Sequence, residues 1–259
     1  MNITFLGTGA SLGIPMIGCS CEVCTSTDPR DQRLRTSLFI RSQEENILID
    51  AGPDFREQML RHGISRIDTF LITHPHRDHI GGLDDTRAIY YAMGKKPLQF
   101  YAESFTLEGV YKYYDYLFPR SGYSSYHGAP GAQWHEIVAG QTFKTLHHTI
   151  LPLRAMHGHM PVTGYKISNL VYLTDVKQVP EDTRRHIHHD TTLVLGALHR
   201  KPHPLHFNLD EALAFIQQTR PARTYLIHMS HWMGKHAALE TILPPNIRPA
   251  YDGLTIQIG

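Results

Sequence analysis

Hydrophobic and polar residues alternate along most of the chain in short runs, which predict β-strands, and longer amphipathic runs between them predict helices. The first seven residues form a strand that enters a glycine-rich loop at 7–13. A helix is expected over 54–61, with Asp54 as its N-cap and Gly63 as its end. The other predicted helices are a short one that begins at Glu181 and one over 209–218 that Asn208 opens. The other predicted strands are 37–41, 46–50, 68–73, 134–138, 149–155, 164–168, 170–174, 191–195, 224–227 and one that begins at Leu254.

These elements follow one another in a mixed order, which predicts an α/β fold. The strands 37–41 and 46–50 form a hairpin across the polar turn at 43–45. The segment from about 84 to 131 differs from the rest because aromatic residues crowd it. We interpret it as an inserted helical, tyrosine-rich cap; a helix pair packed on the core explains it equally well. Its tyrosines include Tyr90, Tyr91, Tyr111, Tyr113, Tyr114, Tyr116, Tyr123 and Tyr126.

Length and composition limit the class of protein. A chain of 259 residues suits one large domain, and we expect a single domain over 1–259. Its 41% hydrophobic and 19% charged residues exclude intrinsic disorder, and no apolar run is long enough to span a bilayer. The formal charge of +1 provides no general attraction for nucleic acid. The first residues lack the pattern of a signal peptide, so we expect a cytoplasmic location.

All three cysteines lie within six residues, at Cys19, Cys21 and Cys24. Their odd number and close spacing do not suit a disulfide framework. In a reducing compartment, such a cluster predicts a bound metal, and three redox thiols are the alternative.

The strongest chemical signal is the string T-H-P-H-R-D-H at 73–79, which directly follows a short apolar strand. In a loop that leaves a strand, His74 and His76 can converge on one ion, while Asp78 and His79 turn toward another. Zn²⁺ and Mn²⁺ accept imidazole and carboxylate ligands together. The alternative is a histidine-rich surface loop in a chain with 19 histidines.

This motif resembles the defining sequence of the metallo-β-lactamase superfamily. The resemblance implies a four-layer αββα sandwich with two metals at one edge of the sheets. The strand that ends in Leu48-Ile49-Asp50-Ala51-Gly52 is also typical of the family. Asp50 is therefore expected to support the site from behind the ligands, although a carboxylate at a strand end is also a common turn former.

The resemblance also implies the remaining ligands by their position after later strands. His157 is the expected third histidine, with His159 as a competitor, while Asp175 and His228 end two further strands. One metal would then take His74, His76 and His157, the other would take Asp78, His79 and His228, and Asp175 would bridge both.

The segment Gly18-Cys19-Ser20-Cys21-Glu22-Val23-Cys24 resembles the C-x-C-x-x-C insert of one subgroup, the phosphodiesterases that open phosphoribosyl 1,2-cyclic phosphate in carbon–phosphorus lyase metabolism. In that subgroup a structural zinc takes its fourth ligand from a histidine three residues beyond the last catalytic ligand. His231 is at that offset. His206 matches a further subgroup histidine, which implies a general acid, and the neighbouring His199 and His203 are alternatives.

The resemblance thus implies a dinuclear phosphodiesterase for a small, cyclic phosphodiester. It would hold two divalent metals, Zn²⁺ or Mn²⁺, and one structural Zn²⁺. Asp78 and His206 are the residues expected to act in catalysis. The alternatives are a tRNA 3′-processing endoribonuclease, whose Gly/Pro-rich basic arm we do not find in the sequence, and a non-catalytic metal-binding protein of cofactor biosynthesis. We expect a small-molecule substrate and no membrane partner, and a homodimer is considered beside a monomer.

Overall fold

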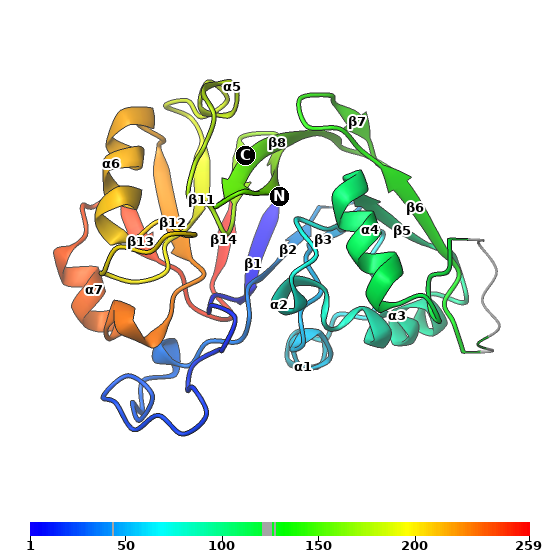
Figure 1. Cartoon of the computed structure of the whole chain (residues 1–259), viewed down its shortest axis with the longest axis horizontal. Helices are drawn as coiled ribbons and strands as arrows, with labels where there is room; N and C mark the ends of the chain where they lie inside the picture. The colour runs from blue at the N-terminus through cyan, green and yellow to red at the C-terminus, as the bar shows by residue number, and fades with distance from the viewer. Residues whose placement is uncertain (43, 121–125, 127) are drawn as a thin grey trace.

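The computed structural model describes residues 1–259 apart from 43, 121–125 and 127. Gln43 of the predicted turn and Tyr123 of the tyrosine-rich segment lie outside the described residues. Two seven-stranded sheets lie between helices in the described part of the chain (Figure 1). The predicted α/β sandwich of the metallo-β-lactamase type is confirmed.

The first sheet has the strand order β14-β1-β2-β3-β4-β5-β6. Its strands pair antiparallel from β14 to β3 and parallel from β3 to β6. Their bounds are β1 Asn2–Gly7, β2 Ser37–Arg41, β3 Asn46–Ile49, β4 Thr69–Leu71, β5 Leu98–Ala102, β6 Ala132–Glu136 and β14 Thr255–Gln257.

The second sheet has the order β13-β12-β11-β10-β9-β8-β7. The strands from β10 to β13 are parallel, and the others are antiparallel. Because parallel strands end at the same edge of a sheet, the loops after β10 and β12 lie near each other. The bounds are β7 Phe143–Lys144, β8 Thr149–His157, β9 Met160–Ile167, β10 Leu170–Leu173, β11 Thr192–Gly196, β12 Arg223–Ile227 and β13 Ile247–Pro249.

Helices cover the outer faces of the two sheets (Figure 1). On the side of the first sheet lie α1 Phe55–His62, α2 Arg77–Ile80, α3 Thr86–Ala92 and α4 Ser104–Tyr113. On the side of the second sheet lie α5 Glu181–Arg184, α6 Leu209–Thr219 and α7 His236–Ile242. Short 3₁₀ helices are η1 Pro29–Asp31, η2 Leu83–Asp85 and η3 His231–Met233.

The alternation of apolar residues along the strands builds three hydrophobic layers. In β3, Ile47 and Ile49 enter the layer between the sheets, while Leu48 enters the layer under the first set of helices. In β11, Val194 enters the central layer, while Leu193 enters the layer under the second set of helices. Successive side chains of a strand point to opposite faces, so strands buried on both sides need apolar residues at consecutive positions.

The tyrosine-rich segment is built into the first half of the sandwich. Its helices α3 and α4 pack on the core through Ile89, Leu107 and Val110, which agrees with the helix-pair interpretation. The segment also contains β5, which the sequence analysis missed. Leu98 and Phe100 of β5 face the core.

The helix boundaries follow the expected local signals. Gly63 ends α1 in the left-handed conformation at φ 58°, whereas Asp54 makes no capping hydrogen bond and instead accepts one from the Arg35 N–H at 2.7 Å. Asn208 and Glu211 form a reciprocal capping box on α6. In the part of the chain that the structure describes, no helix is both long and apolar enough to cross a bilayer.

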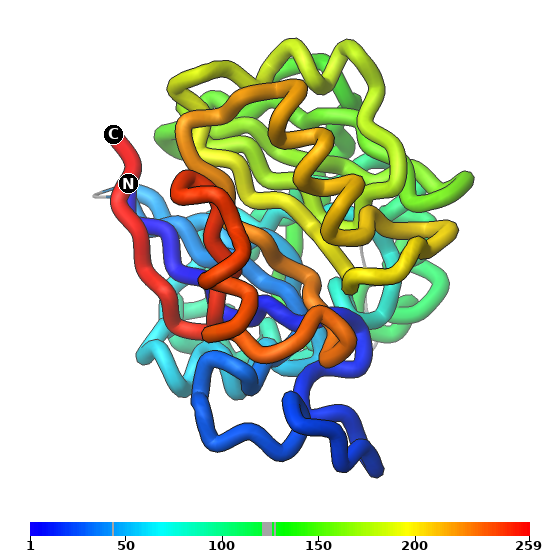
Figure 2. Tube along the Cα trace, turned by 90° about the vertical axis from the view of Figure 1, so that its left-hand side faces the viewer, coloured from blue at the N-terminus to red at the C-terminus, as the bar shows by residue number. Residues whose placement is uncertain are grey.

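The two ends of the chain lie side by side at one edge of the first sheet, where β1 pairs with β14 (Figure 2). The loop after β1, which carries the cysteines, projects from the body of the molecule (Figure 2). The isolated bridge between Gly9 and Met229 ties the base of this loop to the segment after β12.

Candidate metal centres

Loops at the carboxyl ends of strands from both sheets bring the predicted ligands together. The 74–79 string follows β4, Asp175 follows β10 and His228 follows β12. Asp50, Asp175 and His228 have φ angles of 64°, 52° and 55°. Left-handed backbone is costly for residues other than glycine, and it is concentrated at functional sites.

Asp175 lies between two groups of imidazoles. Its Oδ1 lies 3.4 Å from Nε2 of His79 and 3.2 Å from Nε2 of His228. Its Oδ2 lies 3.8 Å from Nε2 of His74. The two groups, each with ligand atoms within 4.8 Å of one another, are Asp78, His79, Asp175 and His228, and His74, His76 and Asp175. Each oxygen of Asp175 thus faces a different group, as a bridging carboxylate would.

His157 reaches the same place from the end of β8. Its ring centroid is 5.2 Å from that of His76, and its ligand atom groups with those of Asp175 and His206. Its Nδ1 donates a hydrogen bond to the Leu205 carbonyl at 2.8 Å, which leaves Nε2 as an acceptor. The competing His159 is exposed. The geometry therefore favours His157 over His159.

Buried Asp50 orients two of these imidazoles from behind. It accepts hydrogen bonds from His79 Nδ1 at 2.7 Å, from the Thr73 backbone N–H at 2.8 Å and from the Thr73 hydroxyl at 2.8 Å. Because the Thr73 hydroxyl donates to Asp50, it accepts from Nδ1 of His74 at 2.9 Å. Both rings therefore keep Nδ1 for the supporting hydrogen bond and turn Nε2 toward Asp175, which is the orientation that binds a metal. Burial opposes protonation of His79, but Asp175, Asp78 and Asp50 raise its pKa well above the usual value, so a cation at its Nε2 would replace a proton.

These residues fit a pair of divalent cations. Nε2 of His74 and Nε2 of His79 are buried and have no hydrogen-bond partner. An unsatisfied buried polar atom costs about 1–3 kcal/mol, so a cation that binds it removes a penalty. Two metal–ligand bonds of about 2.0–2.2 Å at the tetrahedral angle place their ligand atoms roughly 3.4 Å apart. The separations of 3.2 to 3.8 Å around Asp175 are close to this value.

The charges of the site also suit cations. Burial opposes ionisation of Asp175, but His228 and His79 face its carboxylate and hold its pKa well below the usual value. Burial, followed by the charge of His79, lowers the pKa of His74. Asp175 is therefore ionised and His74 neutral at pH 7, which are the protonation states that metal binding requires.

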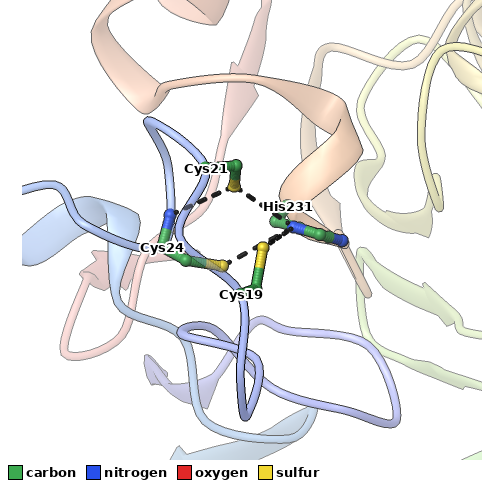
Figure 3. A group of neighbouring side chains, drawn as sticks. All are labelled: Cys19, Cys21, Cys24 and His231. Carbon is green, nitrogen blue, oxygen red and sulfur yellow. Dashed lines mark hydrogen bonds between the residues drawn. The ribbon is translucent and has the colours of Figure 1, made fainter.

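The cysteine cluster closes on a residue from the opposite half of the chain (Figure 3). Nδ1 of His231 lies 3.3 Å from Sγ of Cys19, 3.3 Å from Sγ of Cys21 and 3.6 Å from Sγ of Cys24. A tetrahedral Zn²⁺ with bonds of about 2.3 Å to sulfur and 2.0–2.1 Å to nitrogen gives N···S distances near 3.5 Å. All three cysteines are free thiols. Hydrogen bonds from the Cys24 backbone and from His231 lower the pKa of Cys21 to about 6, whereas burial raises the pKa of Cys24 to about 11. A metal that binds all three sulfurs would therefore displace a proton from Cys24.

His206 lies beside the same carboxylate as the proposed ligands. Its Nδ1 is 4.0 Å from Oδ2 of Asp175, and its ring stacks on that of His228 at 5.1 Å between centroids. Burial and the charge of His228 lower the pKa of His206 to about 3, so its ring is neutral at pH 7 in the free protein. The ring centroid of His203 lies 5.1 Å from that of His206, and that of His199 lies 5.6 Å from that of His203. Of these three histidines, His206 is the one whose ligand atom groups with those of His157 and Asp175.

Three supporting groups were not assigned from the sequence. Thr73 was visible as the first residue of the motif, but its relay to Asp50 depends on three-dimensional geometry, and the Leu205 carbonyl has no sequence signal. Glu103, buried at the end of β5, accepts hydrogen bonds from Arg154 at 2.5 Å and Thr163 at 2.7 Å. The Thr163 backbone N–H donates to the Thr73 carbonyl at 3.0 Å, so this network also fixes the start of the motif.

Comparison with known proteins agrees with this fold. Residues 45–229 match the family model described as the beta-lactamase superfamily domain. A crystal structure described as a new diphosphatase from the PhnP family is 34% identical, superposes with a TM-score of 0.90, and the match covers 98% of this chain and 96% of that one. Human tRNase Z, short form, has the same fold with a TM-score of 0.72 at 20% identity, over the full length of both chains.

A protein of Porphyromonas gingivalis named octanoyltransferase is 39% identical over 256 residues. The match covers 98% of this chain but 51% of that protein, so the chain spans about half the length of this curated relative. The expectation of a metal-dependent hydrolase is confirmed at the level of the family. From its motif, its two sheets and these matches, the chain belongs to the β-lactamase superfamily and, within it, to the PhnP family.

Proposed function

We propose that the protein is a metal-dependent phosphodiesterase that hydrolyses a small phosphodiester such as phosphoribosyl 1,2-cyclic phosphate. One observation carries the proposal: Asp175 directs its two oxygens toward two separate imidazole groups, with His206 beside the same carboxylate. The PhnP-family relative is described as a diphosphatase, which supports hydrolysis at phosphorus.

In this proposal His74, His76 and His157 would hold one cation, and Asp78, His79 and His228 would hold the other. Asp175 would be a ligand of both. When bound, two Zn²⁺ or Mn²⁺ ions supply Lewis-acid polarisation of the phosphoryl oxygens and a water of lowered pKa. The carboxylate of Asp78 would bind the second cation and neutralise part of its charge. Asp50 and Thr73 keep His74 and His79 in the ligating tautomer, so the site is ordered before substrate enters.

His206 is the proposed general acid. An alkoxide leaves phosphorus slowly unless it is protonated, and a positioned imidazole adds about 10²- to 10⁴-fold to the rate. The ring is neutral in the free protein. To act as an acid it must carry a proton in the substrate complex, and the negative charge of a bound phosphodiester raises its pKa in that direction. The stacked position on His228 holds the ring over the site.

The second metal function is structural. We propose that Cys19, Cys21, Cys24 and His231 hold a Zn²⁺ with four protein ligands, which leaves no position open for chemistry. His231 follows His228 by three residues, so this zinc would anchor the projecting loop beside the reactive site. The donor distances support this assignment over three redox thiols.

Two other functions share parts of this geometry. A tRNA 3′-processing endoribonuclease would use the same metal set, and the fold of human tRNase Z is similar. In the described residues of the 84–131 segment, the cations Arg87 and Arg120 are paired with Asp84 and Glu108, which does not favour an RNA grip. A non-catalytic metal-binding protein would not need His206.

The leaving group separates these functions experimentally. In His206→Ala, we expect turnover of a cyclic ribose phosphate, which loses an alkoxide, to fall about 10²- to 10⁴-fold. Hydrolysis of methyl p-nitrophenyl phosphate should fall far less because p-nitrophenolate leaves without a proton. Metal content should not change, and His189→Ala, at an exposed histidine, is the matched control. An equal loss on both esters would reject the acid role, and faster cleavage of a tRNA precursor than of either ester would favour the nuclease.

A further inference from the structure

A groove of about 780 Å³ begins at the metal edge and runs along the tyrosine-rich helix α4. Its lining includes Pro75, His76, Tyr111, Lys112, Tyr113 and Met160. His76 is one of the proposed ligands, and Met160 pairs across the β8–β9 hairpin with His157, which is another. The inner end of the groove is therefore continuous with the place where the reacting phosphate would lie.

The end of the same helix also lines a smaller cavity next to the motif. That cavity has a volume of about 240 Å³, and it shares Pro75, His76 and Tyr113 with the first. Tyr113 thus stands between the two cavities, next to the motif. Its side chain is 58% exposed, so a large part of its surface is available for contact.

Close packing holds α4 against the motif, so the groove is formed in advance. A Cβ atom on Gly109 of α4 would lie 2.3 Å from Cβ of Pro75, which shows how closely the helix approaches the loop. Just beyond the helix, the Tyr114 hydroxyl donates to the Ile80 carbonyl at 2.9 Å, at the end of α2. A groove with fixed walls binds a rigid ligand without the loss of conformational entropy that ordering its own residues would cause.

The chemistry of the groove favours a flat, uncharged ring. Tyr111 lies under the guanidinium of Arg120 at 5.1 Å, and Tyr113 lies under the ammonium of Lys112 at 5.7 Å. Arg120 is ion-paired with Glu108, and the lining holds one further cation, Lys112, and one further carboxylate, Asp115. The lysine, arginine and acidic side chains of the lining therefore carry no net positive charge that would attract a second phosphate. Tyrosine rings with proline and methionine are surfaces on which heteroaromatic rings stack.

We propose that this groove binds the nucleobase of a nucleotide-like phosphodiester, with Tyr113 as the stacking residue. The inference rests on the proposed function, because it places the ester phosphate at the Asp175 edge. Within the class of small phosphodiesters, it favours a diester that carries a nucleoside on one side of phosphorus over phosphoribosyl 1,2-cyclic phosphate, which has no base. The groove volume lies within the range of small-molecule sites, about 300–1,000 Å³.

Two esters with the same leaving group test the groove. Thymidine 5′-(p-nitrophenyl phosphate) carries a base, and methyl p-nitrophenyl phosphate does not. In Tyr113→Ala, the KM for the thymidine ester should rise about 5- to 100-fold, the loss that one base–aromatic stack gives, with little change in kcat. Both constants for the methyl ester should stay close to wild type. Tyr113→Phe should keep the wild-type KM.

Tyr91→Ala is the matched control. Tyr91 is half exposed, lies under Lys95 at 5.8 Å and belongs to α3, outside the groove lining. An unchanged KM for the thymidine ester in Tyr113→Ala, or an equal change for both esters, would overturn the proposal.

A binding measurement separates this inference from the proposed function. Saturation-transfer NMR on metal-depleted protein should show contact with the base protons of thymidine 5′-monophosphate, and Tyr113→Ala should remove it. If wild type hydrolyses neither ester but this contact is seen, the proposed function fails and the groove assignment stands. If no contact is seen in wild type, the groove assignment fails.

Discussion

Hydrogen bonds at Nδ1 decide which ring nitrogen of each candidate histidine ligand faces Asp175. His79 donates from Nδ1 to Asp50, His74 donates to Thr73, and His157 donates to the Leu205 carbonyl. A histidine that is held in this way loses little rotational freedom when a metal binds. The affinity of the site therefore depends on residues that would not touch the metal.

Asp50→Asn tests this dependence at a single atom. The amide has one acceptor oxygen and two N–H donors, so it cannot accept from His79 and both Thr73 groups as the carboxylate does. We expect metal affinity, measured by competition with a chromogenic chelator, to fall about 10- to 100-fold. Asp182→Asn, at an exposed carboxylate, should leave it unchanged. Wild-type affinity in Asp50→Asn would show that the network does not support the metals.

At the scale of elements, the site depends on how α4 meets the motif loop. Gly109 has no Cβ, which lets the helix approach Pro75 between His74 and His76. Glycine in a helix costs roughly 0.5–1 kcal/mol relative to alanine, so its presence at this position is explained by the close approach.

Gly109→Ala should therefore destabilise the protein, although helix propensity alone would favour alanine. Alanine in an unhindered helix would stabilise the protein, but here its Cβ would overlap Pro75, and overpacking costs about 1–3 kcal/mol. We expect a lower urea midpoint together with weaker metal binding, since Pro75 separates His74 from His76. A higher midpoint with unchanged metal affinity would contradict this description of the contact.

Elements with a clear local signal were predicted from sequence, and those that depend on their neighbours were not. The strand 37–41 agrees with β2, and Asn208 with its acidic turn correctly opens α6. The strand β5 was missed because its five residues stand among tyrosines, which also suit a helix pair. The grouping of the metal ligands could be expected from family resemblance alone, because the strands that carry them are far apart in sequence.

At the scale of the whole molecule, Asp252, near the end of the chain, connects two segments from its beginning. It accepts hydrogen bonds from the Thr8 hydroxyl at 2.7 Å, after β1, and from the Leu34 backbone N–H at 2.6 Å, before β2. Burial raises the pKa of Asp252 to about 6, against about 3.8 for an ordinary aspartate. The folded protein thus binds this proton more tightly than the unfolded chain does.

The sign of the pH effect follows from this difference. Asp252 contributes stability below pH 4, where it is protonated in both states, and that contribution is lost as pH rises through 6. In metal-free protein, the free energy of unfolding of wild type relative to Asp252→Asn should fall by about 2–3 kcal/mol between pH 4 and pH 7. Urea denaturation at each pH measures it. A pH-independent difference between the two proteins would show that the carboxyl is not perturbed.

The central claim is that two metal ions share Asp175 at one edge of the sandwich while a third is enclosed by the cysteines. Anomalous diffraction from crystals grown with Zn²⁺ or Mn²⁺, measured on both sides of each absorption edge, tests it most directly. We expect two peaks on opposite sides of the Asp175 carboxylate and a zinc peak between Cys19, Cys21, Cys24 and His231. A map with no peak beside Asp175, at full occupancy of the cysteine site, would contradict the account.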